Sequence, residues 1–329
     1  MKTLYVVGGK RKKDDFRLQE WNRFEKGLIV KVRPEAGASE LCVEYVTPPE
    51  VCAEAESPSK LFKAGTLLGA RLCVCTQTEV MAYELPTLRR ISYVSLPCFN
   101  DLHHVYPTPD GNYLVAIAGL DMVIEITPDG TILREWDVLG ETPWERYSRD
   151  TDYRKVLTTK PHRSHPNYVF QANGQVWVTR FEQKDSISLT QSDKRINIAV
   201  ERPHDGIVYR EWVYYTTVDG HVVVADLKTT QVLRVINLNE ISTKSDMTLG
   251  WCRGLAVLDE NRIIVGFSRL RPTKWRENVR WIKRSMGIQA GTLPTRITLY
   301  DLKCQKIAWE KNLEDTGMGA IFSIHALME

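Results

Sequence analysis

The stretch of sequence that decides the fold is FNDLHHVYPTPDGNYLVAIAGLDMVIEITPDGTILREWDV, residues 99–138. Two Pro-Asp-Gly turns, at 109–111 and 128–130, separate short runs that are rich in Val, Ile, Leu and Tyr. Pro and Gly preset the backbone of tight turns, and β-branched and aromatic residues favour strands. The stretch therefore predicts a four-stranded antiparallel meander with the strands HHVYPT, YLVAIAG, MVIEIT and ILREWDV.

The same alternation of strands and turns recurs along the chain at the spacing of propeller blades. The further copies are residues 61–97, 162–200, 203–238 and 251–313, the last with a long insertion after its second strand. The N-terminus adds TLYVVGG, GLIVKVR and LCVEYV, which look like the second, third and fourth strands of a blade, and the C-terminus adds IFSIHALM, which looks like a first strand. Pairing the two ends completes a sixth blade and leaves no open edge. We therefore predict an all-β fold, a six-bladed β-propeller that residues 1–329 form as a single domain.

The composition is that of an ordinary soluble protein. The 329 residues are 43% hydrophobic and 26% charged, and 44 basic against 41 acidic residues leave a net charge of +3, too balanced to indicate a nucleic acid or membrane partner. The apolar stretch in the N-terminal MKTLYVVGGKRKKDD is too short for a signal sequence, and no apolar run of the sequence is long enough to span a membrane. We expect a cytoplasmic protein.

The seven cysteines are an odd number without a small-domain framework, so we expect reduced thiols. Cys73, Cys75 and Cys304 sit inside apolar strand patterns, which indicates burial. Cys73 and Cys75 share one face of a strand, but no second cysteine pair follows, so core packing is favoured over half a metal site.

A polar residue opens the first strand of most repeats, and it is a histidine in four of them. The first strand of a propeller blade lines the axis, so its first residue faces the mouth of the channel. We predict a ring there, in blade order: His325, Phe62 or Lys63, His104, His165, His204 and Arg253. His103 and His162 lie beside this ring in the sequence.

Four histidines on one axis favour a metal site. Neutral imidazoles are good ligands for Fe, Zn, Cu or Ni, and carboxylates such as Asp101, Glu201 or Asp205 could orient them. The leading hypothesis is a small-molecule enzyme whose divalent metal ion is held by the four histidines of the ring, namely His104, His165, His204 and His325. Arg253 would hold an acidic substrate group, and His103 and His162 would assist catalysis.

Other functions remain open on the same residues. One is a metal-free enzyme for group transfer or cyclisation, which uses a channel histidine and Arg253. Anion binding without chemistry, a purely structural role for the histidines, and a non-catalytic scaffold for a protein partner are the others. Lyase, isomerase, hydrolase and oxygenase chemistry are all compatible with the leading hypothesis. No Gly-x-Ser-x-Gly, His-Glu-x-x-His or phosphate-binding glycine loop occurs.

Two insertions do not fit blades. Residues 139–161 are polar and aromatic, and residues 269–294 place Trp275, Val279 and Ile282 at helical spacing among many basic residues. Loops of this length in a compact repeat fold are usually functional or disordered. We expect both insertions to cover one end of the channel, with Trp275 and Trp281 packing back on its mouth.

At HHVYPTPDGNYLVA and VIEITPDGTILREWDV the chain resembles the arylsulfotransferase group of propellers. The resemblance implies a six-bladed propeller with histidines and an arginine around a channel, where one histidine carries the sulfuryl group transiently. By position, His104, His165, His204 and Arg253 would be the counterparts. The four-histidine set is also similar to that of the carotenoid-cleaving oxygenases, which hold a non-haem iron, but those have seven blades and longer insertions.

Overall fold

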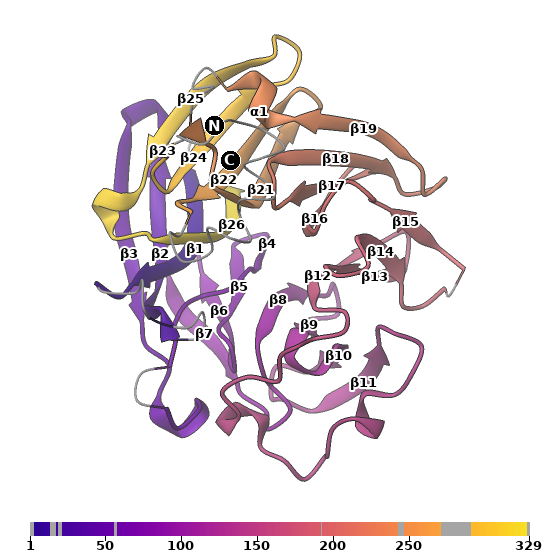
Figure 1. Cartoon of the computed structure of the whole chain (residues 1–329). Helices are drawn as coiled ribbons and strands as arrows, with labels where there is room; N and C mark the ends of the chain where they lie inside the picture. The colour runs from indigo at the N-terminus through magenta and orange to yellow at the C-terminus, as the bar shows by residue number, and fades with distance from the viewer. Residues whose placement is uncertain are drawn as a thin grey trace.

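The computed structural model describes residues 3–13, 18, 22–55, 58–191, 193–242, 247–270 and 291–327. Within these residues six four-stranded antiparallel sheets stand around a central axis as the blades of a propeller (Figure 1). Helix is confined to the short α1 (Leu238–Ile241) and a few 3-10 turns. The all-β, six-bladed prediction is confirmed.

Each blade runs from an inner strand at the axis to an outer strand at the rim. Blade 1 combines β26 (Ala320–Leu327), β1 (Thr3–Arg11), β2 (Phe24–Arg33) and β3 (Ala38–Tyr45). Blade 2 has β4 (Thr66–Leu68), β5 (Arg71–Cys75), β6 (Val80–Glu84) and β7 (Arg89–Val94), and blade 3 has β8 (Leu102–Pro107), β9 (Tyr113–Ile117), β10 (Met122–Ile126) and β11 (Ile132–Asp137). Blade 4 has β12 (Pro166–Ala172), β13 (Gln175–Arg180), β14 (Asp185–Ser188) and β15 (Arg195–Asn197), and blade 5 has β16 (Pro203–Tyr209), β17 (Trp212–Thr217), β18 (His221–Asp226) and β19 (Val232–Asn237). Blade 6 has β21 (Trp251–Asp259), β22 (Arg262–Ser268), β24 (Arg296–Asp301) and β25 (Lys306–Asn312), and β20 (Met247–Thr248) pairs in parallel with β23 (Gly291–Thr292).

The two chain ends close the propeller, as predicted. β26 pairs antiparallel with β1, and Tyr5 lies opposite His325 in this ladder. Ile321 and Ile324 of β26 are buried in a cluster that also contains Ile264 and Ile297 of blade 6. The C-terminal strand therefore joins blade 1 to blade 6 through hydrophobic packing as well as through backbone hydrogen bonds.

Side-chain alternation along the strands fills the spaces between blades. Cys73 and Cys75 are buried in the cluster between blades 2 and 3, whereas Val74 packs on the other face with residues of blade 1. This confirms that Cys73 and Cys75 pack in the core. Cys304, in contrast, is exposed, because it lies in the turn after β24, where its backbone N–H donates to Asp301 Oδ1 at 2.9 Å.

The inner strands share an irregularity near the end where they begin. In five blades the register shifts there. The shifted residues are Phe322 in β26, His103 in β8, Asn167 in β12, Asp205 and Gly206 in β16, and Arg253 and Gly254 in β21. A bulge bends the strand and re-aims a side chain. Gly254 shows the tightness of this packing, because its φ is 86° and a Cβ there would meet Ile321 at 3.2 Å.

The long connection 139–161 lies on the side of the propeller where the inner strands begin. It leaves β11, forms 3-10 turns at Pro143–Glu145 and Tyr153–Lys155, and leads into β12 near the axis (Figure 1). The insertion expected at 269–294 falls mostly outside the described residues, together with Trp275, Val279, Trp281 and Ile282. No helix in the described part of the chain has the length and apolarity that crossing a membrane requires.

Candidate functional site: a cavity at the propeller axis

A cavity of about 1080 Å³ opens at the axial end where the inner strands begin. Every blade contributes a side chain to its lining near the axis. We call these six residues the axial ring: Phe322, Lys63, His103, His165, His204 and Arg253, in blade order. The sequence placed Lys63 (with Phe62 as the alternative), His165, His204 and Arg253 at this ring. Phe62 instead is fully buried and stacks on Tyr45 at 5.5 Å.

His104 is not part of the ring, which corrects the sequence-based placement. Its ring is fully buried and does not line the cavity. Its Nδ1 accepts a hydrogen bond from the Val169 N–H at 3.2 Å, and its Nε2 lies 3.1 Å from the Gly65 carbonyl oxygen. His104 thus connects blades 2, 3 and 4, with its Nδ1 lone pair occupied. Strand alternation is the reason, since neighbours in a strand point to opposite faces.

His325 is also absent from the ring. It lies three residues further along β26 than Phe322, roughly 10 Å at the rise of a strand, and it does not line the cavity. Its Nε2 is 2.9 Å from Ser323 Oγ, and burial lowers its pKa to about 3. The four histidines expected to share one metal ion are therefore not brought together. Phe322 takes the place of His325 and lies under the guanidinium of Arg253, at 4.2 Å.

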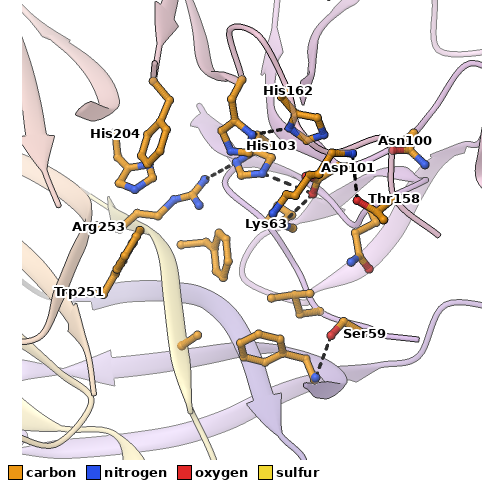
Figure 2. Close-up of a pocket in the computed structure, with 18 of the residues that line it drawn as sticks. Ser59, Lys63, Asn100, Asp101, His103, Thr158, His162, His204, Trp251 and Arg253 are labelled. Carbon is orange, nitrogen blue, oxygen red and sulfur yellow. Dashed lines mark hydrogen bonds and ion pairs between the residues drawn. The ribbon is translucent and has the colours of Figure 1, made fainter. Parts of the chain in front are cut away.

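A chain of polar contacts crosses the ring. Arg253 Nη2 donates to His103 Nδ1 at 3.2 Å, and His103 Nε2 lies 3.4 Å from Asp101 Oδ1. Lys63 Nζ donates to the same carboxylate oxygen at 3.1 Å. Since a guanidinium only donates, Nδ1 of His103 carries the lone pair and Nε2 carries the proton. Figure 2 shows Arg253 and Lys63 approaching this pair from two sides.

His165 is held in a strained backbone conformation by a buried carboxylate. Its φ is 58°, in the left-handed region. Asp121 Oδ1 accepts the N–H groups of Ser164 and His165 at 3.0 and 2.8 Å. The ring Nδ1 of His165 lies 2.7 Å from Nδ1 of His162, so one of these nitrogens donates to the other. His162 lines the cavity beside the ring.

His204 differs from the other ring histidines, because neither of its ring nitrogens has a hydrogen-bond partner among the described residues. The residue is only 2% exposed and lines the cavity. Its ring lies between Phe181, at 5.3 Å, and Trp251, at 6.0 Å. A buried polar group without a partner is costly, so a buried imidazole facing a cavity indicates a ligand or water there.

The cavity keeps its imidazoles neutral and its central carboxylate charged. Burial, followed by the charge of Arg253, holds the pKa of His204 well below its usual range. Burial also holds the pKa of His103 and of His165 well below that range. Burial would raise the pKa of Asp101, but the Lys63 ammonium and the His103 ring outweigh it and hold this pKa well below its usual value.

Positive charge dominates the lining. Eight Lys or Arg residues line the cavity against three acidic residues. The acidic residues are paired: Asp101 with Lys63, Glu182 with Arg202 at 3.2 Å, and Glu201 with Lys184 at 3.3 Å. Of the three carboxylates expected to orient histidines, Asp101 contacts His103, whereas Glu201 lines the cavity and pairs with Lys184, and Asp205 does not line the cavity.

The connection 139–161 covers the cavity, in agreement with the prediction. Val156, Leu157, Thr158 and Lys160 of this segment line it. The amide of Asn100 fixes the segment by donating to the carbonyl oxygens of Tyr153, at 2.9 Å, and Val156, at 2.7 Å. Of the second insertion, Arg269 and Leu270 line the cavity.

One group of side chains could hold a metal ion. Ligand atoms of Asp101, His103 and His165 all lie within 4.8 Å of one another, and among the described residues they are the one His, Cys, Asp or Glu group with this property. His165 belongs to the expected metal set, and His103 was expected to assist catalysis. Lys63 and Arg253 already contact Asp101 and His103, so positive charge surrounds the position that a cation would take.

Several lining residues were not anticipated from the sequence. Phe181, Trp251 and Phe322 form the aromatic part of the lining, and Asp121 positions His165. Phe181 follows β13 and Trp251 begins β21, at the axial ends of their strands. No signal in the sequence marks the bulge at Phe322, so an alignment on polar residues placed His325 in the ring instead.

Comparison with known proteins supports the fold and leaves the function open. The chain matches no protein-family model and no curated protein sequence. Among solved structures it is similar to a protein of unknown function from Bacteroides caccae, with a TM-score of 0.63, 16% identity and 98% of each chain covered. It is more distantly similar to dihydro-heme d1 dehydrogenase NirN in complex with DHE, with a TM-score of 0.44, 13% identity, and 93% of this chain and 53% of that chain covered.

Fold and site together define a six-bladed β-propeller with a histidine-rich, basic cavity on its axis. The similarity to the Bacteroides caccae protein is one of fold, over the whole length of both chains. No family match supports the arylsulfotransferase resemblance, which stays a prediction.

Proposed function

We propose that this protein is a metal-free enzyme for a small anionic substrate, which it binds in the axial cavity. Arg253 holds the acidic group, and His204 acts on the substrate as base or nucleophile. The observation that carries this proposal is the imidazole of His204, which is buried at the cavity wall and whose two ring nitrogens have no hydrogen-bond partner in the part of the chain that the structure describes.

The charges of the lining support an anion rather than a cation as the ligand. Arg253 lies against Phe322 and His103, which leaves its guanidinium planar and oriented beside the cavity. Arginine is well suited to bind carboxylate, phosphate or sulfate groups through two parallel hydrogen bonds. Binding an anion there would offset the excess of positive charge in the lining.

The protonation state of His204 supports its role. Burial and Arg253 lower its pKa, so the ring is neutral at physiological pH and one nitrogen has a lone pair. As a base, this nitrogen takes a proton from the substrate and the resulting imidazolium returns it to the product. As a nucleophile, it bonds to an electrophilic group of the substrate while the leaving group departs.

Chemical labelling tests the proposal. Diethyl pyrocarbonate acylates neutral imidazole nitrogens that have a free lone pair, and mass spectrometry assigns the adducts. We expect His204 to be acylated, His104 to be unreactive because its Nδ1 is occupied, and acetate, phosphate or sulfate to protect His204. Arg253→Met should abolish the protection. The proposal is contradicted if no anion reduces the labelling of His204 in either the wild type or the variant.

A metal centre at Asp101, His103 and His165 is the second candidate, favoured by the short distances among their ligand atoms. Elemental analysis of the purified protein distinguishes the two. The metal-free proposal predicts that anion protection of His204 survives treatment with a chelator. The metal centre is favoured instead if the protein contains a stoichiometric metal and Asp101→Asn removes both this metal and the protection of His204 by anions.

A further inference from the structure

The cavity is larger than an acidic group needs, and its two ends differ in chemistry. The axial ring supplies histidines and cations at one end. The rest of the lining mixes polar and apolar residues, and we call its apolar part the apolar lobe: Phe24, Cys52, Ala53, Pro58, Leu61, Val156 and Leu157. Figure 2 shows Ser59, which borders this lobe, well apart from the histidine cluster.

Packing around the lobe shows that its floor is built from hydrophobic side chains. Phe24, Leu61 and Ala320 are buried in a small cluster of their own, on which Phe322 of the axial ring packs. All four line the cavity. The apolar floor is therefore continuous with the axial ring, and one molecule can contact both.

Two connections form the walls of the lobe and are tied to the fold. The segment between β3 and β4 is held at Ser59, whose Oγ accepts the Phe24 N–H at 3.0 Å. Lys155 of the covering connection donates to the Pro49 carbonyl oxygen at 2.9 Å and so bridges the two walls. Arg154 borders the lobe, but Asp152 neutralises it at 2.7 Å. The walls of the lobe are thus tied to the fold, and two arginines border it: Arg154, and Arg11, which lies opposite Phe24 in the β1–β2 ladder.

We propose that the substrate is an amphipathic acid, with its carboxylate at Arg253 and its apolar body in the apolar lobe. This inference rests on the proposed function and names its substrate class. Transfer of apolar surface from water into such a lobe is favourable in proportion to the area buried. Each added methylene should therefore tighten binding by about three- to fourfold until the lobe is full.

Calorimetric titration with acetate, butanoate, hexanoate, octanoate and decanoate tests this. We expect the dissociation constant to fall along the series, and 1-octanol to bind more weakly than octanoate because it lacks the carboxylate. Ala53→Trp should remove the gain with chain length and leave acetate binding unchanged. Ala55→Trp, two residues away and outside the lining, is the matched control, and thermal melting checks that both variants fold.

The possible failures are distinguishable. If the acids bind but chain length has no effect, or if 1-octanol equals octanoate, the amphipathic-acid proposal is overturned and the anion-binding function stands. If no acid binds at any length and none protects His204 from acylation, the proposed function is overturned as well.

Discussion

At the scale of single residues, His103 and His104 show that a shift of one position along a strand changes where a side chain lies. They are adjacent in β8, yet His103 faces the cavity and His104 faces the blade interior. The sequence shows two neighbouring histidines and a strand, and alternation requires that they face opposite ways. It does not show which one faces the axis, because the bulge at His103 sets the phase, and bulges have no signature in this stretch.

Asp205 leads to a prediction about stability. Burial raises its pKa to about 6, above the value of about 4 for an unfolded aspartate, and outweighs the hydrogen bonds that Oδ2 accepts from Thr216 Oγ1 and the Gly254 N–H. The folded state then binds the proton more tightly than the unfolded state. Stability should fall by about 2 kcal/mol as pH rises from about 4 to about 6, with little further change above.

Asp205→Asn is the test of this linkage. An amide oxygen in place of Oδ2 keeps both hydrogen bonds, and the side chain no longer ionises. Urea denaturation between pH 4 and pH 8 should show less loss of stability with rising pH in the variant than in the wild type. Asp110→Asn, at an exposed turn, is the matched control. Parallel curves for Asp205→Asn and wild type would contradict the expected shift.

At the scale of elements, the connection 139–161 is the part of the site that no strand pattern could place. Its length and aromatic content predict a functional loop, and the structure places part of it in the cavity lining. Its position depends on Asn100, far away in sequence, which bonds Tyr153 and Val156. Contacts between loops and distant side chains have no periodicity, so the sequence alone does not reveal them.

Asn100→Ala should release this connection. Loss of two buried hydrogen bonds, each contributing about 1 kcal/mol, should increase local opening by roughly tenfold or more. We expect faster tryptic cleavage at Arg154 and Lys155 and weaker protection of His204 by anions. Asn112→Ala is the control, because its amide contacts Glu125 within blade 3. Equal cleavage rates in the two variants would show that Asn100 does not hold the connection.

At the scale of the whole molecule, β26 closes the propeller and contributes a residue to the cavity lining. The strand completes blade 1, packs on blade 6 and places Phe322 between Arg253 and Lys63. The need to leave no open edge predicts this closure from the two incomplete ends of the chain. This requirement does not set the register of closure, which shifts at the bulge at Phe322.

Ile324→Ala should weaken this closure. Ile324 is 3% exposed and packs in the cluster shared by blades 1 and 6, so truncation should cost about 2–4 kcal/mol. Ile132→Ala, on the outer strand β11 with 40% exposure, should cost less than about 0.5 kcal/mol. Urea midpoints give both values. A similar loss in both variants would argue against a special role for the closing strand.

The sequence by itself determined the six blades, their strands, the pairing of the chain ends and four of the six residues of the axial ring. Turn residues, strand periodicity and repeats are local signals, and they can be recognised in a single sequence. Only the tertiary structure decided that His104 and His325 leave the axis, that His103 and Phe322 take their places, and that an apolar lobe adjoins the ring. These depend on bulges and on contacts between distant segments, where a shift of one residue exchanges the two faces of a strand.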